Sequence, residues 1–276
     1  MGEDSLESVI DAKGPPLRSQ LAEYWDYRGL LWHLVVKELK VRYRQTTLGI
    51  AWSLAQPLLP ALILGAVFSH TLAGGKDLSV PYALLLLSGL VPWSFLSSAV
   101  NSASGAFVSN GYILTKVYFP RAVLPAASVM AASVEFMGGC AILCAWAMVA
   151  GYPIRWSWLG LPGMLIYTAL LAFLISIGIA SLNVLYRDIR HALPFLLQVW
   201  MYATPILYTP QLVPEKWRWL LGLNPMTGIV LGFRSVLFGT PFDARLGATS
   251  VCAGVVAGIA GIVIFLRLQH ELAESV

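Results

Sequence analysis

The fold is decided by residues 32–60, WHLVVKELKVRYRQTTLGIAWSLAQPLLP, where a basic segment changes into an apolar one. The stretch is amphipathic up to Arg44, and after Arg44 the chain carries no charge until Lys76. This pattern predicts a helix on the membrane surface that turns, near residues 46–49, into a membrane-crossing helix.

Helical phase divides this segment into two faces. One face is a narrow basic stripe of His33, Lys37, Lys40 and Arg44. The broad apolar face holds Trp32, Val35, Val36, Leu39 and Tyr43. A second apolar strip of Leu30, Leu34 and Val41 makes the amphipathicity imperfect. The basic stripe is either a positive-inside anchor or a docking surface for a cytoplasmic protein.

Composition extends this reading to the whole chain. Of 276 residues, 58% are hydrophobic and only 12% are charged, and the mean hydropathy is +0.72. Because backbone polar groups in lipid must be satisfied internally, long apolar runs predict helices. We therefore expect an all-α integral membrane protein with a polar cytoplasmic segment (1–26), an amphipathic interface helix (27–47) and a transmembrane domain (48–276). Six spans of about 20 residues are expected near 49–71, 82–106, 123–149, 159–184, 190–208 and 248–266.

Lysine and arginine set the orientation of these spans. Twelve of the 18 such residues fall on one side and six on the other, which places both termini and the 107–122 and 185–190 loops in the cytoplasm. The pI near 9.0 follows from this bias and does not indicate nucleic-acid binding. The first 26 residues lack the layout of a cleavable signal, so the N-terminus is expected to be retained. The three cysteines lie in predicted spans and are interpreted as packing residues.

Residues 209–247 do not fit a simple loop. The apolar pieces around Trp217 and Met226–Phe238 are too short to span and are separated by Asn224-Pro225. A short re-entrant helical hairpin on the external side, acting as a gate, fits this pattern. An amphipathic belt at the interface is the alternative.

Two features of the spans leave their roles open. Glu135 is the only acid placed within lipid, and it is either functional or a hydrogen-bonded packing residue. Gly254 and Gly258 have GxxxG spacing, with Gly261 beyond, and they indicate close packing either within one protomer or at a dimer seam.

Enzyme motifs are absent from the sequence. It contains no GxxxxGK[ST] loop, no HExxH and no paired Cys-x-x-Cys, and its four histidines are scattered. We expect no catalytic or metal site and no cofactor in this chain, so energy comes from an ion gradient or from another protein. An ion-coupled carrier usually has several intramembrane charges and two similar halves. The basic segments expected on the cytoplasmic side are the helix before the first span, the Lys116–Arg121 loop and the Arg187–Arg190 loop. They would serve as contacts for an ATPase subunit and favour an ATP-driven permease instead.

Five stretches together resemble one family. They are VKELKVRYRQTTLGIAWSLAQPLLP (36–60), ILTKVYFPRAVLP (113–125), NVLYRDIRHALP (183–194), YATPILY (202–208) and LNPMTGIVLGFRSVLFG (223–239). In this order they resemble the membrane subunit of bacterial ABC exporters of polysaccharides, the O-antigen, capsule and teichoic-acid permeases of the type-2 class.

The resemblance implies partners and a location. It implies a homodimer in the bacterial inner membrane that binds two nucleotide-binding subunits, which carry ATP and Mg²⁺. The implied substrate is a glycan on a polyprenyl-diphosphate or other lipid carrier. An ABC permease for a drug or smaller lipid, an ion-coupled carrier and a membrane scaffold or insertase remain alternatives.

The resemblance also assigns roles to residues. ATPase coupling is expected at Arg28, His33, Lys37, Lys40, Arg42, Arg44, Lys116, Arg121, Arg187, Asp188 and Arg190. Contact with the lipid diphosphate is the alternative for four of them, Arg28, Lys37, Lys40 and Arg42. The translocation path is expected at Trp52, Trp93, Phe107, Tyr112, Glu135, Trp200, Tyr202 and Tyr208, although membrane-interface belts also use many aromatics. The external gate is expected at Trp217, Trp219, Asn224, Pro225 and Arg234.

Overall fold

The computed structural model describes residues 25–44, 49–68, 80–116 and 119–269. Nearly all of the predicted segment 1–26, residues 45–47 of the predicted interface helix and most of the stretch between the first two predicted spans lie outside the described residues. The elements are α2 (Arg28–Arg42), α3 (Ile50–Phe68), α4 (Tyr82–Ser104), α5 (Ala106–Ser109), α6 (Gly111–Lys116), α7 (Val123–Val149), η1 (Trp156–Gly160), α8 (Leu161–Leu185), α9 (Ile189–Ala203), η2 (Pro210–Leu212), α10 (Glu215–Gly222), α11 (Pro225–Phe238) and α12 (Ala244–Leu268). The described chain is therefore all-α.

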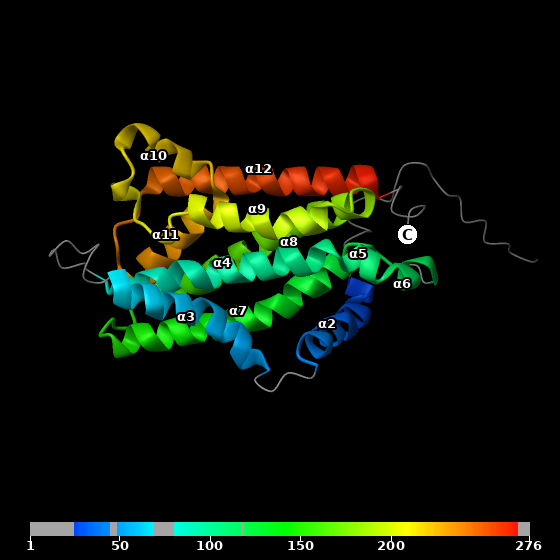
Figure 1. Ribbon diagram of the computed structural model, residues 1–276, viewed down its shortest axis with the longest axis horizontal. Coiled ribbons are helices and arrows are strands. Elements are labelled where there is room, and N and C mark those ends of the chain that lie inside the picture. Colours follow the sequence, from blue (N-terminus) through cyan, green and yellow to red (C-terminus); the bar gives the residue numbers. More distant parts are fainter. Residues whose placement is uncertain (1–24, 45–48, 69–79, 117–118, 270–276) are drawn as a thin grey trace, which may run out of the picture.

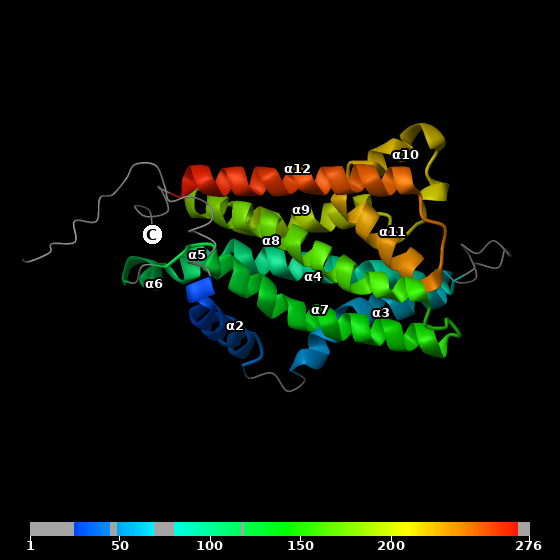
Figure 2. The same ribbon diagram turned by 180° about the vertical axis from the view of Figure 1, so that it is seen from behind.

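The long helices lie roughly parallel and form one elongated bundle (Figures 1 and 2). The short helices α5 and α6, together with α2, lie at one end of the bundle, where α12 also ends. The pair α10 and α11 lies at the other end, where α12 begins. The basic elements and the predicted hairpin therefore occupy opposite ends.

Helix α4 is the centre of the bundle. Of the residues in its most apolar 18-residue stretch, 78% are buried, against 17% in α3 and 22% in α12. Leu84, Leu86, Leu96 and Ala99 are fully buried. The outer helices leave apolar side chains exposed, as a membrane-embedded bundle requires.

Five helical stretches are long and apolar enough to cross a membrane: α3, α4, α7, η1 with α8, and α12. Helix α9 has 15 residues, or about 22 Å at about 1.5 Å per residue, which is less than the roughly 30 Å hydrocarbon core. Because α9 ends at Ala203, the prediction of a helix over 190–208 is wrong for residues 204–208. Pro205 has no N–H to donate and disfavours helical backbone at Thr204, so the chain turns there.

The glycines of α12 pack within the protomer. A Cβ on Gly258 would lie 2.6 Å from Leu174 Cδ1, and one on Gly261 would lie 2.0 Å from the Leu174 carbonyl oxygen. Both contacts are with α8, and a Cβ on Gly178 of α8 would lie 2.8 Å from the Gly261 Cα. Of the two interpretations left open by the spacing, the structure therefore shows close packing of α8 against α12.

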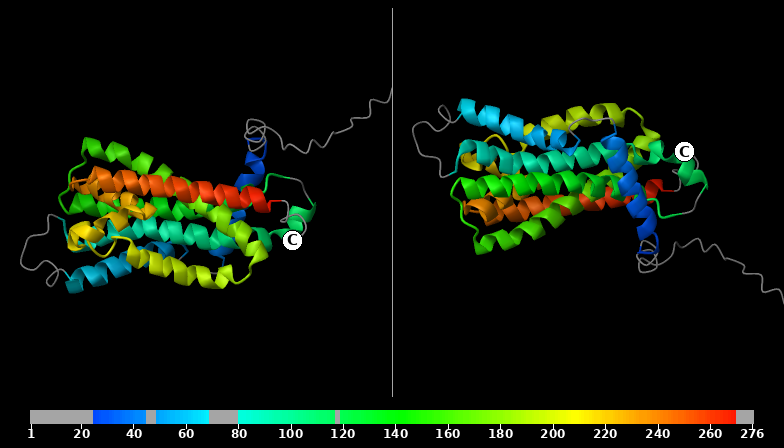
Figure 3. Two further views of the ribbon diagram at one scale, coloured as in Figure 1. Left: turned by 90° about the horizontal axis from the view of Figure 1, so that it is seen from above. Right: turned by 90° about the horizontal axis from the view of Figure 1, so that it is seen from below.

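Helix α2 crosses the bundle obliquely rather than running along it (right panel of Figure 3). In both panels α3 and α9 lie on the same flank of the bundle. The surface helix thus meets the ends of the long helices, while α3 and α9 together form one lateral face.

Candidate coupling and translocation site

The inward face of α2 is apolar and rests on protein. Leu34 and Val35 are buried in a cluster with Phe107 of α5, Ile177 of α8 and Phe265 of α12. The apolar face of the helix therefore packs on the ends of the long helices. A rotation or shift of α2 would press directly on those ends, because cores pack too closely to absorb it.

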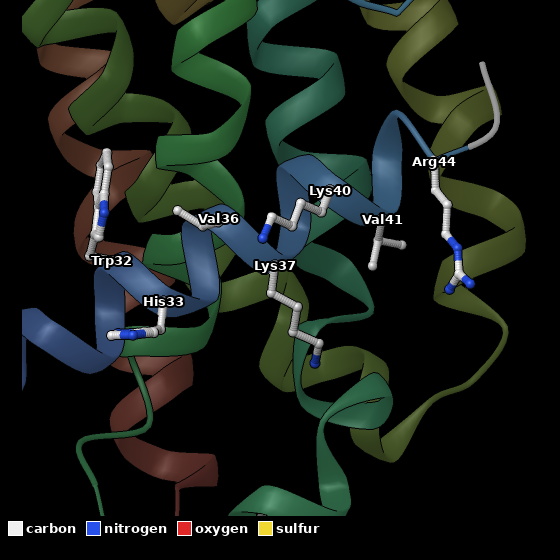
Figure 4. Close-up of a pocket in the computed structure, with 7 residues that line it drawn as sticks. All are labelled: Trp32, His33, Val36, Lys37, Lys40, Val41 and Arg44. Atoms are coloured by element: carbon white, nitrogen blue, oxygen red, sulfur yellow. The ribbon is translucent and has the colours of Figure 1, made fainter. Parts of the chain in front are cut away.

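The outward face of α2 carries an open groove of about 760 Å³. Figure 4 shows the side chains that line it: Trp32, His33, Val36, Lys37, Lys40, Val41 and Arg44. All four members of the predicted basic stripe are among them and are exposed. The prediction that Trp32 lies opposite that stripe is wrong, because its side chain is 61% exposed in the same groove. The inward face is narrow and is occupied by Leu34 and Val35.

The stripe places like charges one turn apart. Lys37 and Lys40 are three residues apart, and Lys40 and Arg44 are four apart. Pairs at this spacing repel on a helix, which costs a few tenths of a kcal/mol each. An acidic partner laid along the groove would remove that repulsion.

Lys37 also reaches the α5–α6 segment at the same end of the bundle. Its Nζ donates to Oδ1 of Asn110 across 2.7 Å, and Asn110 is buried between α5 and α6. Asn110 Nδ2 in turn donates to the carbonyl of Ala106 across 2.8 Å. The basic helix and the α5–α6 segment, which carries the predicted coupling residue Lys116, are thus joined by a direct contact.

Arg42 points away from the groove and into the bundle. Its Nη1 lies 2.7 Å from Oε1 of Glu135 in α7, and its Nη2 donates to Ser102 Oγ in α4 across 2.7 Å. Nη1 also lies 3.3 Å from Ser98 Oγ. Arg42 therefore does not belong to the exposed basic surface, and it ties the end of α2 to two long helices.

Glu135 is a paired residue in this arrangement. Tyr43, which follows α2, also donates its phenolic hydrogen to Glu135. Burial, and then the hydrogen bond to Glu135, raise the pKa of the Tyr43 hydroxyl, so it keeps its proton at neutral pH and remains a donor. Sequence reasoning left the role of Glu135 open, and the structure places it as the acceptor at the centre of this network.

The other predicted coupling residues frame the same end of the bundle. Lys116 of α6 is exposed, and its Nζ lies 6.0 Å from the centroid of the Tyr112 ring. Arg121 is half-buried just before α7. The turn between α8 and α9 exposes Arg187, Asp188 and Arg190, and Arg28 is exposed at the start of α2, where it donates to the Trp25 carbonyl.

The predicted path residues do not share one environment. Trp52, Tyr112 and Tyr202 are exposed, and Glu135, Trp200 and Tyr208 are half-buried. Trp93 and Phe107 are buried in the protomer, which differs from the predicted lining role. Trp93 packs edge-on against Trp200 at 5.5 Å between centroids, and Phe107 lies under α2. These two side chains are core residues, because the helices around them close over them.

At the opposite end, Asn224 joins α9 to α11. Its Oδ1 accepts from the Met226 N–H and from Nε1 of Trp200, both at 2.9 Å. Its Nδ2 donates to Thr204 Oγ1 across 2.8 Å. Pro225 occupies the first helical position, where a missing N–H costs nothing. Helices α10 and α11 meet at 98° beside it, and α10 exposes Trp217 and Trp219.

Arg234 of α11 is buried at this end, only 3% exposed, with its guanidinium among backbone carbonyls. Arg234 was predicted as a residue of the external gate. In the structure its guanidinium donates to the irregular segment after α9 and stabilises that segment from inside the protein. Tyr82 donates to the Leu207 carbonyl in the same segment across 2.7 Å. Such non-helical backbone is tolerated at membrane depth only where protein satisfies it.

Several residues of the site were missed in the sequence. Tyr43 was placed on an apolar face, and Asn110, Ser98 and Ser102 were given no role of their own. The spacing of Ser98 and Ser102, four residues apart, puts both hydroxyls on one face of α4 and was a usable signal. The partner of that face could not be read from the sequence, because α2 and α4 meet only in three dimensions.

The described residues of the site present exposed charges on α2 and partly buried polar contacts beneath it. Within the described residues, no group of three His, Cys, Asp or Glu side chains could hold a metal ion. A basic surface helix at one end of the bundle, braced against the long helices by partly buried polar contacts, defines a multi-pass α-helical membrane protein with an exposed basic surface at that end.

The chain belongs to the ABC-2 type transporter family, whose pattern matches residues 29–238. It is 32% identical, over 89% of its length and 96% of the relative's, to an O-antigen export system permease protein, RfbA, of Klebsiella pneumoniae. An RfbA protein of Myxococcus xanthus is 29% identical over 92% of this chain and 98% of its own. The polysialic acid transport protein KpsM of Escherichia coli is 25% identical over 71% of this chain and 76% of its own.

Proposed function

We propose that this chain is the permease subunit of an ATP-driven exporter that moves a lipid-linked polysaccharide, of the O-antigen, capsule or teichoic-acid type, across the bacterial inner membrane. ATP and Mg²⁺ belong to two separate nucleotide-binding subunits, and this chain holds no cofactor. Both termini and the α2 end of the bundle face the cytoplasm in this proposal. The names of the relatives support the polysaccharide class.

The observation that carries the proposal is the pairing of the basic groove of α2 with the α5–α6 segment through Lys37 and Asn110. A partner that engages the groove would move α2. Lys37 bonds Asn110, and Leu34 belongs to a buried cluster that contains Phe107 of α5 and Leu124 of α7. A movement of α2 would therefore act directly on α5 and α7. This arrangement suits a chain driven from outside by another protein.

A homodimer would form along the flank of α3 and α9 in this proposal. The two helices of that flank each carry an exposed aromatic side chain, Trp52 of α3 at 60% and Tyr202 of α9 at 55%. Aromatic side chains stack on the CH faces of sugars, so a channel between two such flanks would suit a glycan. The glycan's lipid carrier, of the polyprenyl-diphosphate type, would remain in the bilayer beside it.

Reconstitution with the nucleotide-binding subunit tests the proposal. The two chains are co-purified, placed in vesicles, and assayed for ATP hydrolysis and for export of a lipid-linked glycan. The double substitution Lys37→Glu and Lys40→Glu should leave the permease folded but abolish stimulation of ATP hydrolysis by substrate. Arg245→Glu, at an exposed position at the far end of the bundle, is the matched control and should behave as wild type.

The same assay separates the alternatives. Export of a drug-like molecule or a single lipid, with no glycan export, would replace the polysaccharide by a smaller substrate. Transport driven by a proton gradient in the absence of any ATPase partner would contradict the proposal altogether. Retained coupling in the Lys37→Glu, Lys40→Glu variant would reduce the basic stripe to a membrane anchor.

A further inference from the structure

A polar pocket of about 270 Å³ lies under the end of α2. Its walls come from the end of α2, the start of α3, the cytoplasmic part of α4 and the middle of α7. The lining residues are Arg42, Tyr43, Gly49, Trp52, Ser53, Gln56, Ser98, Asn101, Ser102 and Glu135. This volume is just below the usual range of about 300–1,000 Å³ for small-molecule sites and suits a group as small as one sugar ring.

The charge of the pocket is balanced. Arg42 and Glu135 are 20% and 14% exposed and lie 2.7 Å apart, so each neutralises the other. A phosphate or diphosphate entering here would be attracted to Arg42 and repelled by Glu135 at nearly the same distance. A partly buried ion pair of this kind therefore gives an anion little net attraction.

The remaining lining groups suit a neutral, polyhydroxylated ligand. Ser53, Ser98 and Ser102 carry hydroxyls, which can both donate and accept, and Gln56 carries an amide with the same two functions. Asn101 Nδ2 donates to the Ser97 carbonyl across 3.0 Å, so this residue offers its Oδ1 as an acceptor. The Arg42–Glu135 pair adds charged donors and acceptors, which make stronger hydrogen bonds. A sugar ring presents alternating donors and acceptors and matches such a wall.

Trp52 supplies the apolar surface that a sugar also needs. It stands in the first turn of α3 at the edge of the pocket and is 60% exposed. An indole at that position can cover the CH face of a ring whose hydroxyls bond to α4 and α7. Polar walls with one aromatic face distinguish a sugar site from a site for a purely apolar lipid.

The pocket ends where the bundle becomes apolar. A narrow space continues past Ser98 and Glu135 toward Val91, Phe95 and Phe136, with a volume of about 30 Å³. That volume holds about one water molecule and no ring. A bound sugar would therefore stay beside Trp52 and the polar ends of α3 and α4.

We propose that this pocket binds a single neutral sugar ring of the exported glycan, held by the Arg42–Glu135 pair and the amide of Asn101 and covered by Trp52. The proposal rests on the proposed function and adds to it a location and a ligand preference. The exposed basic stripe on α2 lacks such a neutralising partner within the described residues, and anionic groups would be attracted there instead.

Equilibrium binding to the full chain in lipid nanodiscs tests the proposal without the ATPase partner. The two probes are geranyl diphosphate and the same diphosphate carrying one hexose, titrated by calorimetry after purification in a detergent that contains no sugar. Wild-type protein should bind the hexose-bearing probe about tenfold more tightly, the effect of one or two net hydrogen bonds. Trp52→Ala and Asn101→Ala should each lower this ratio toward one, and Trp52→Phe should largely restore it.

Trp156→Ala is the control, because Trp156 is an exposed tryptophan outside the pocket, in η1. It should keep the wild-type ratio. Equal binding of the two probes by wild-type protein would overturn the proposal, and so would a wild-type ratio in both Trp52→Ala and Asn101→Ala. Either result leaves the proposed export function standing if the reconstituted exporter still moves glycan, so the two failures are distinguishable.

Discussion

Arg234 in α11 donates from Nη2 to the carbonyl oxygen of Ile206 across 2.8 Å, joining a helix to a segment that has no helix of its own. The same nitrogen lies 3.3 Å from the Leu85 carbonyl in α4, and Nη1 lies 3.5 Å from the Tyr208 carbonyl. One guanidinium thus serves carbonyls from two parts of the chain. The fixed fork of donors explains why arginine, rather than lysine, stands here.

Arg234→Met should destabilise the protein, because it leaves the Ile206 carbonyl without this donor in a buried position. The expected loss is roughly 1–3 kcal/mol of unfolding free energy, the cost of one unsatisfied buried polar group. Thermal unfolding in detergent followed by tryptophan fluorescence measures it. Arg245→Met removes an exposed arginine at the same end and should not change the melting temperature.

Asn110→Ala should weaken the link between α2 and the α5–α6 segment. The substitution removes the acceptor of Lys37 and the donor to the Ala106 carbonyl, with an expected loss of about 1 kcal/mol in stability. In the reconstituted complex we expect ATP hydrolysis to continue and glycan export to fall. Ser109→Ala, one residue earlier and exposed, serves as the control. Unchanged export with Asn110→Ala would show that α2 acts through its apolar packing alone.

A double-mutant cycle on Arg42 and Glu135 should reveal strong coupling between the two positions. Arg42→Met or Glu135→Gln alone leaves the other charge without its partner, and each should cost about 1–3 kcal/mol, less than for a fully buried pair because both side chains retain some exposure. The double variant should be more stable than the sum of the single losses indicates. Additive losses in chemical unfolding would contradict a direct interaction.

Much of the bundle could be predicted from the sequence, because apolar length and charge placement act locally. The surface helix, the spans α3, α4, α7, α8 and α12, and the break at Asn224-Pro225 follow from such local signals. The end of α9 did not follow, since an apolar run continues past Thr204 although Pro205 ends the helix. Apolar content predicts burial in lipid and says little about where a helix stops.

The candidate site was less predictable, because its contacts join distant parts of the chain. Arg42 looked like one more basic residue of the surface helix, and only its approach to Glu135, 93 positions away, shows that it points inward. Trp93 and Phe107 looked like lining residues, yet aromatic side chains serve cores and channels equally well. Residue type restricts what a position can do, and tertiary packing decides which of those roles it takes.

Gly261→Ala should separate α12 from α8, because the new Cβ would lie 2.0 Å from the backbone carbonyl oxygen of Leu174. Backbone cannot move aside as the end of a side chain can, so the helices must shift, at a cost of roughly 1–3 kcal/mol for overpacking. Gly163→Ala, in α8 with nothing within 4 Å of the new Cβ, is the matched control. Alanine at that exposed helical position should be neutral or stabilising by up to about 1 kcal/mol. Equal melting temperatures for the two variants in detergent would mean that the close approach of α8 and α12 contributes nothing to stability.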